Sequence, residues 1–165
     1  MFVLSLRTHK KSLILGLSCV VIALLVLYFA VNREAPVVND GAISLKASTQ
    51  QERLAFFSQF GWDVDEDPVK VEEVVIPTEF NEVYAKYNQL QIKQNFDLTK
   101  YAGKTVKKWT YRIKNYPGYG TDSDFIHANI LVCEGAVIGG DVSSLEQNGF
   151  MRTFDFPEQG EQLVE

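Results

Sequence analysis

Cysteine and histidine are scarce in this 165-residue sequence, which contains two residues of each type. One of each, Cys19 and His9, lies in the first 31 residues, so Cys133 and His127 are the only ones in the rest of the chain. A single cysteine cannot form a disulfide within that part. One histidine and one cysteine also cannot supply the three or four ligands of a usual zinc site. We therefore expect no metal and no cofactor.

The same scarcity argues against nucleophilic catalysis. The residues from 125 to 133 alternate as a β-strand does, and at ~3.3 Å per residue a strand separates His127 from Cys133 by about 20 Å. A base and a nucleophile must lie within hydrogen-bonding reach of each other. We interpret Cys133 as a small core residue and His127 as a half-buried structural residue, and no residue is predicted to be catalytic.

Charge is absent from the twenty residues Ser12 to Val31. A helix of that length, at ~1.5 Å per residue, spans about 30 Å, the thickness of a bilayer's hydrocarbon core. Three basic residues lie among positions 7–11, and such residues stay on the cytoplasmic side. The sequence predicts a single-pass anchor in the cell membrane, with residues 1–11 in the cytoplasm. The alternative is a cleaved signal peptide, but bulky aromatic residues stand where cleavage requires small ones.

Basic residues are outnumbered after this run. All 21 acidic residues but only 13 of the 16 basic ones follow Val31, which gives this part a formal net charge of 13 − 21 = −8. An acidic surface repels nucleic acid, so no nucleic-acid partner is expected. We divide this part into a linker (32–47), one extracytoplasmic domain (48–156) and a polar tail (157–165).

Two helices are predicted in the first half of the domain. The first begins at Thr49, because Thr49 and Glu52 have the spacing of a capping box, and Gly61 suits the left-handed residue that follows a helix. A strand follows over residues 69–76 and is expected to become buried on both faces toward its end. The second helix runs from Thr78 to Asn95, with Gln91 on its polar side. Its predicted buried face consists of Phe80, Val83, Tyr84, Tyr87 and Leu90.

Strands dominate the second half. Alternating residues predict strands over 108–114, 125–133 and 136–142, and a short edge strand over 150–154. Glu134 and Gly135 are expected to form a hairpin turn, and Gly139-Gly140 marks a bulge or a close approach of another backbone. The result is an α+β fold in which two helices pack on one face of a mainly antiparallel sheet.

Four residues are candidates for ligand binding: Tyr116, Tyr119, Arg112 and Asp141. Aromatic rings beside basic side chains suit stacking on a sugar ring or gripping a peptide. Trp109 and Tyr111 belong to the same aromatic and basic set, but their alternation favours the core face of the sheet. Asp141 follows the glycine pair, for which backbone packing is the preferred interpretation.

The landmarks together resemble an uncharacterised domain family of Firmicutes, especially clostridia, over about residues 49–154. The landmarks are Gly61-Trp62, Ile76-Pro77-Thr78-Glu79-Phe80, Tyr84, Tyr87-Asn88-Gln89-Leu90-Gln91, Phe96-Asp97-Leu98, Tyr101-Ala102-Gly103-Lys104, Tyr111, Asn115-Tyr116-Pro117, Ile138-Gly139-Gly140-Asp141 and Gly149-Phe150-Met151. The resemblance implies an N-terminal membrane segment with a small extracytoplasmic domain, and it implies no activity. Asn95 stands where a glycine is expected.

These observations favour a non-catalytic binding or interaction module of the bacterial cell envelope. Its expected partners are the membrane, through Ser12 to Val31, and an envelope protein or wall component. One alternative is a cell-wall-modifying hydrolase that uses Asp141 with Glu134 or Asp155, since two carboxylates about 5–9.5 Å apart suffice for glycoside chemistry. The other alternative is a cleaved, secreted form of the same domain.

Overall fold

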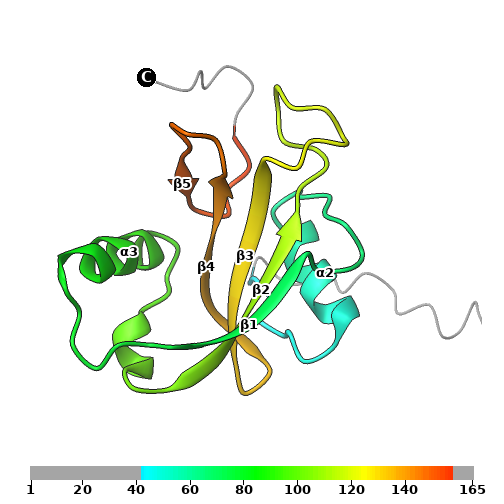
Figure 1. Cartoon of the computed structure of the whole chain (residues 1–165). Helices are drawn as coiled ribbons and strands as arrows, with labels where there is room; N and C mark the ends of the chain where they lie inside the picture. The colour runs from blue at the N-terminus through cyan, green and yellow to red at the C-terminus, as the bar shows by residue number, and fades with distance from the viewer. Residues whose placement is uncertain (1–41, 158–165) are drawn as a thin grey trace, which may run out of the picture. The chain divides into compact units, whose positions relative to one another are not determined.

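A computed structural model describes residues 42–157 of the chain. Five antiparallel strands form one sheet in the order β1-β2-β3-β4-β5, with helices packed on it (Figure 1), so the predicted α+β class is confirmed. The elements are α2 (Gln50–Ser58), β1 (Lys70–Val75), α3 (Glu82–Lys93), the 3₁₀ helix η1 (Leu98–Tyr101), β2 (Thr105–Arg112), β3 (Ile126–Cys133), β4 (Ala136–Ser144) and β5 (Met151–Arg152). The predicted membrane segment, residues 12–31, lies outside the described residues. Within residues 42–157, every helix is too short or too polar to cross a membrane.

Helix α2 begins and ends as its sequence predicts. The Thr49 hydroxyl accepts a hydrogen bond from the Glu52 N–H (3.2 Å), and the Glu52 carboxylate accepts one from the Thr49 N–H (3.0 Å). This reciprocal pair satisfies two backbone donors at the start of the helix. Beyond the helix, Gly61 has a φ of +85°, and the Trp62 N–H donates to the Phe57 carbonyl (3.2 Å). Gly61 therefore provides the left-handed residue that ends the helix.

Helix α3 begins later than predicted. Its N-cap is Asn81, whose side-chain oxygen accepts from the Tyr84 N–H (2.9 Å), and not Thr78. The Phe80 ring packs edge-on against Tyr84 (centroids 4.8 Å apart), so the chain turns into the helix only after Phe80. Asparagine is as good an N-cap as threonine, so the later start costs the helix little stability. The predicted end is confirmed, since Asn95 is left-handed with a φ of +66°.

The two helices cover opposite faces of the sheet, and the prediction that they share one face is wrong (Figure 1). Alternate residues of β3 separate into two hydrophobic clusters, because side chains of a strand point to opposite faces. Ile130 belongs with Phe56 and Phe57 of α2, whereas Leu131 belongs with the cluster against which Tyr84 and Tyr87 of α3 pack. Strands β3 and β4 are buried on both faces, so each face requires its own cover.

The side of α3 that faces the sheet combines aromatic and polar residues. Phe80, Tyr84 and Tyr87 pack on the cluster there, as predicted, but two polar residues are buried deeper. Asn88 and Gln91 are buried, whereas Val83, assigned to the buried face, is 76% exposed. The Asn88 side-chain oxygen accepts from the Leu98 N–H (2.8 Å), and that of Gln91 accepts from the Gly140 N–H (2.7 Å). The helix therefore docks partly through its aromatic rings and partly by satisfying backbone donors of η1 and β4, and a count of apolar positions does not detect the second part.

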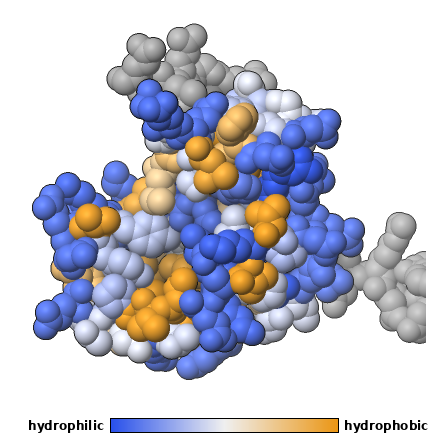
Figure 2. Space-filling view, viewed as in Figure 1, coloured by the Kyte–Doolittle hydropathy of each residue, from blue (hydrophilic) through white to orange (hydrophobic). Residues whose placement is uncertain are grey.

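Strand β1 lies at an edge of the sheet, and the prediction that it becomes buried on both faces is wrong. It pairs in register with β2, from Lys70 opposite Thr110 to Val75 opposite Thr105. Val75 is 62% exposed, and Val69 and Val71 are exposed as well. Figure 2 shows that the apolar residues on this face of the molecule form several separate patches among hydrophilic ones.

Candidate functional site

The two loop tyrosines occupy different environments. Tyr116 is only 5% exposed, and its ring stacks on Trp62 (centroids 5.7 Å apart, planes within 6°) and on Phe150 (5.2 Å). Its predicted position on the surface is therefore corrected: the loop folds back and its ring completes the cluster beneath α2. Tyr119 is half-buried and donates its hydroxyl hydrogen to Glu146. The two rings contact each other edge-on (centroids 5.6 Å apart), so they belong to one aromatic cluster and not to an open stacking surface.

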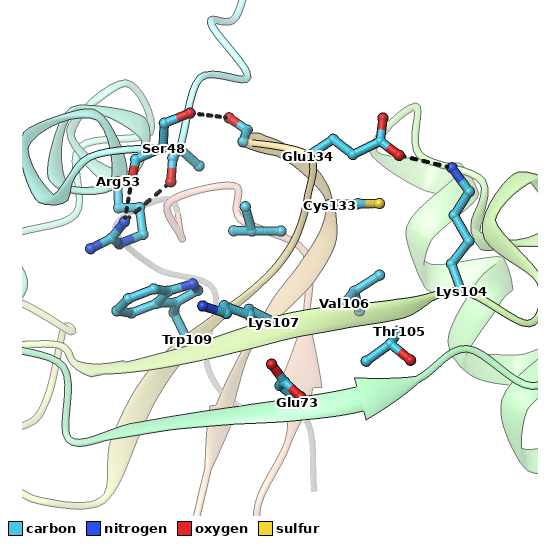
Figure 3. A pocket seen from close by; sticks show the side chains of 13 residues that line it. Ser48, Arg53, Glu73, Lys104, Thr105, Val106, Lys107, Trp109, Cys133 and Glu134 are labelled. Carbon is cyan, nitrogen blue, oxygen red and sulfur yellow. Dashed lines mark hydrogen bonds and ion pairs between the residues drawn. The ribbon is translucent and has the colours of Figure 1, made fainter.

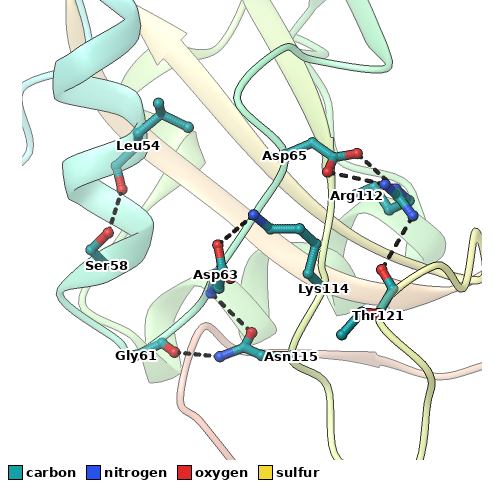
Figure 4. A network of polar contacts seen from close by, with 9 residues as sticks. All are labelled: Leu54, Ser58, Gly61, Asp63, Asp65, Arg112, Lys114, Asn115 and Thr121. Carbon is teal, nitrogen blue, oxygen red and sulfur yellow. Dashed lines mark hydrogen bonds and ion pairs between the residues drawn. The ribbon is translucent and has the colours of Figure 1, made fainter.

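Arg112 lies in a network of polar contacts at the end of β2 (Figure 4). Its guanidinium donates to both carboxylate oxygens of Asp65 (2.7 and 3.1 Å) and to the Thr121 carbonyl (3.3 Å). The hydrogen bond to Asp65 raises the pKa of Arg112. Close by, Lys114 pairs with Asp63 (2.8 Å). These contacts fasten the segment after α2 to β2, and they already satisfy the group that a ligand of Arg112 would use.

Asp141 belongs to a buried polar cluster between β4 and α3. It is 2% exposed, and its two oxygens accept hydrogen bonds from the Asn129 amide (2.9 Å) and the Tyr87 hydroxyl (3.0 Å). The Asn129 side-chain oxygen in turn accepts from the Thr110 hydroxyl (2.7 Å). Burial raises the pKa of Asp141, and the hydrogen bonds from Asn129 and Tyr87 oppose that rise. The pKa of Tyr87 lies well above its ordinary value because of burial and the neighbouring carboxylate.

The glycine pair before Asp141 marks a bulge, as predicted. The β3–β4 register shifts between Leu131 and Val132, and Gly139 lies opposite Leu131. A Cβ atom on Gly140 would lie 2.5 Å from the Phe154 ring and closer still to the backbone of Asn129. Close approach of another backbone and of an aromatic ring explains why this position requires glycine.

His127 and Cys133 occupy the environments expected of them. His127 is half-buried, and burial lowers its pKa. Cys133 is buried in the hydrophobic cluster on the α3 side of the sheet, which confirms its interpretation as a core residue. Among residues 42–157, no three histidine, cysteine, aspartate or glutamate side chains are grouped so that they could hold a metal ion.

A pocket of about 720 Å³ opens between the start of α2, the strands β1 and β2, and the β3–β4 turn (Figure 3). Pockets that hold small ligands have volumes of roughly 300–1,000 Å³. Its lining consists of Ala47, Ser48, Arg53, Glu73, Lys104, Thr105, Val106, Lys107, Trp109, Val132, Cys133, Glu134 and Gly135. Several charged side chains converge on this pocket, and we take it as the candidate site.

Arg53 is the buried charge of this pocket. Its side chain is held at three points: Nε donates to the Tyr111 hydroxyl (2.9 Å), and Nη1 donates to the carbonyls of Ala47 (3.2 Å) and Ser48 (3.3 Å). The guanidinium carbon lies 3.6 Å from the centroid of the Trp109 ring. A cation over an aromatic face is attracted by the ring's charge distribution, so Trp109 fixes the guanidinium further.

The segment before α2 positions this arginine. The Ala47 N–H donates to the Gly135 carbonyl (2.8 Å), and the Val137 N–H donates to the Leu45 carbonyl (2.7 Å). Residues 45–47, predicted to belong to the linker, therefore lie against the β3–β4 hairpin. This contact closes one side of the pocket and places the two carbonyls that Arg53 binds.

Residues 56–142 match the family described as a domain of unknown function (DUF4830). The chain belongs to this family. No curated protein and no solved structure matches the sequence. The DUF4830 match runs from α2 to β4, so it contains Trp109, Lys107 and Glu73 of the pocket, while Arg53 lies three positions before it.

Arg53 was not predicted as a site residue, although a signal for it is present in the sequence of this DUF4830 chain. Arg53 precedes Phe56, Phe57 and Phe60 at the spacing i, i+3, i+4 and i+7, which is one face of a helix. A cation on an apolar helix face must be buried or must displace the packing. The sequence does not show that Lys107 and Glu73 line the same pocket, because only the pairing of β1 with β2 brings them opposite each other.

Proposed function

We propose that this DUF4830 protein is a single-pass, membrane-anchored binding module of the bacterial cell envelope. Its anchor is the uncharged segment from Ser12 to Val31, and its domain lies outside the cytoplasmic membrane. The length of that segment and the basic residues before it support this arrangement. The partner is an envelope protein or a wall component, and it enters the Arg53 pocket.

The pocket itself is the observation that carries the binding role. It has the volume of a ligand site, and its central cation is immobilised before any ligand arrives. A side chain that is already ordered loses little conformational entropy on binding, so more of the contact energy appears as affinity. Arg112 and Tyr116, by contrast, already have their contacts within the domain.

The hydrolase alternative has less support. A glycosidase needs two carboxyl groups that face each other across the bond to be cut. Asp141 is 2% exposed, and both of its oxygens are occupied by Asn129 and Tyr87. The cleaved, secreted form would carry the same pocket and would differ only at its N-terminus, which the mass of the mature chain distinguishes.

Site-specific crosslinking in intact bacterial cells tests this proposal. A photo-reactive residue is placed at Lys107, which lines the pocket, and in a matched variant at Lys100, an exposed lysine of η1 outside its lining. We expect a discrete adduct from position 107 in the membrane fraction and none from position 100. Because the domain is proposed to lie outside the cytoplasmic membrane, protease added outside the cells is expected to digest it. Equal or absent adducts at both positions would argue against a binding role for the pocket.

A further inference from the structure

Arg53 is a buried cation whose partners are all neutral. It is 6% exposed, and it contacts a phenol hydroxyl, two backbone carbonyls and an indole ring. None of the ion pairs among residues 42–157 includes Arg53. Burying a charge without a counter-charge is unfavourable, and neutral hydrogen-bond acceptors compensate for it only in part. An anion bound in the pocket would therefore stabilise the charge of Arg53.

The hydrogen bonds of Arg53 also leave one nitrogen available. A guanidinium carries five N–H groups, one on Nε and two on each Nη. Nε is used by Tyr111, and Nη1 is used by Ala47 and Ser48. Nη2 has no hydrogen-bond partner among the described residues, and Arg53 lines the pocket. Because Arg53 lines the pocket and its position is fixed, an acceptor that enters the pocket meets an ordered guanidinium.

The other charges of the lining restrict which anion fits. Lys104 is paired with Glu134 (3.3 Å), so those two charges largely cancel. Lys107 has no ion pair among the described residues, and Glu73 lies opposite it in the β1–β2 register. The lining as a whole holds three cations and two carboxylates. One unit of positive charge in excess matches a single negative charge, and the carboxylate of Glu73 disfavours a second one, as in the phosphate dianion.

Resting on the proposed binding role, we infer that the pocket binds a monoanionic carboxylate, of which the C-terminal carboxylate of a peptide is the simplest case. The carboxylate accepts a charge-assisted hydrogen bond from Arg53 Nη2, and Lys107 adds attraction at the rim. The remainder of the ligand lies along the lining between Glu73 and the β3–β4 turn.

The test uses the full chain in a mild detergent and three probes: the dipeptide N-acetyl-Ala-Ala, its C-terminal amide, and inorganic phosphate. Binding is followed by tryptophan fluorescence, since Trp109 lines the pocket, and Trp109→Phe shows which part of the signal comes from it. For a ligand of this size we expect a Kd on the order of 1 mM for the free acid. The amide and phosphate are expected to bind at least about tenfold more weakly. The amide lacks the charged acceptor, and the second negative charge of phosphate is repelled by Glu73.

Four variants separate a binding role of Arg53 from a structural one. Arg53→Gln is expected to weaken acid binding by about tenfold or more, but it also removes a buried contact, so its Tm is measured in parallel. Lys107→Gln and Glu73→Gln change exposed side chains of the rim and leave the core intact. We expect about threefold weaker binding for Lys107→Gln and about threefold tighter binding for Glu73→Gln, the size typical of exposed charges. Lys100→Gln, outside the pocket, is the matched control and is expected to bind as the original chain does.

Two results would overturn the inference. The first is that acid and amide bind equally well, or that neither binds at a ligand concentration 20-fold above the expected Kd of about 1 mM. The second is acid binding that does not respond to Lys107→Gln or Glu73→Gln, because the carboxylate would then lie elsewhere. If either occurs while the crosslink at position 107 persists, the pocket still binds a partner, and only its carboxylate specificity is refuted.

Discussion

Among the glycines of the described residues, Gly140 is the one at which an added Cβ atom would meet the closest contact. An added Cβ atom would lie 2.5 Å from the Phe154 ring and 3.1 Å from the carbonyl carbon of Asn129. Phe154 is itself enclosed by the rings of Phe56 and Phe57, with centroids 5.1 and 6.3 Å away. One neighbour is backbone in the centre of the sheet and the other is a ring in the core. Gly140→Ala therefore requires β3 and β4 to separate locally.

The cost of that separation can be bounded. Overpacking a core ordinarily costs about 1–3 kcal/mol, and because backbone is involved we expect Gly140→Ala to cost about 3 kcal/mol. A domain of this size loses roughly 3–5 °C of Tm per kcal/mol, so the Tm should fall by about 10–15 °C. The matched control is Gly120→Ala, whose Cβ would meet nothing within 4 Å. Thermal unfolding of the full chain, followed by circular dichroism, measures both. A Tm for Gly140→Ala as high as that of Gly120→Ala would refute the reasoning.

Three further predictions concern single side chains. Burial raises the pKa of Asp141 in the folded protein, so its contribution to stability is greatest below the unfolded pKa and is lost as pH rises through the folded pKa. Asp141→Asn should remove this contribution from the pH dependence of unfolding measured from pH 3 to 8, and an unchanged pH dependence would contradict the reasoning. Glu134 has a φ of +53°, which asparagine tolerates better, so Glu134→Asn should stabilise by about 0.5–1 kcal/mol, and a lower Tm would contradict this. Tyr116→Ala should cost about 3 kcal/mol in denaturant unfolding and Tyr119→Ala less than about 1 kcal/mol, and equal costs would show that Tyr116 is not a core residue.

Features determined by a few adjacent residues were predictable from the sequence. The capping box at Thr49, the left-handed Gly61 and Asn95, and the turn at Glu134 each depend on backbone preferences that a short segment specifies by itself. The bulge beside Gly139 was predictable for the same reason, although the groups that approach Gly140 were not.

Features determined by distant parts of the chain were not predictable in this way. The placement of the two helices on opposite faces follows from β3 and β4 being buried on both sides, and periodicity alone does not show which helix covers which side. Tyr116 appeared exposed because its loop contains Pro117 and Gly118, but Trp62 and Phe150 enclose it from distant positions. The candidate pocket depends on the same kind of contact, since α2, β1 and the β3–β4 turn meet there.

Arg53 and Asp141 show why burial of a charge has different meanings at two places in one domain. Both are buried, on opposite faces of the sheet, and both are unfavourable to bury. Each carboxylate oxygen of Asp141 accepts a hydrogen bond from within the domain, one from Asn129 and one from Tyr87, so the buried charge is already stabilised. The guanidinium of Arg53 keeps its Nη2 without a partner among the described residues and borders a 720 Å³ pocket. We propose that only the second arrangement is completed by a molecule from outside, and the functional prediction therefore rests on Arg53.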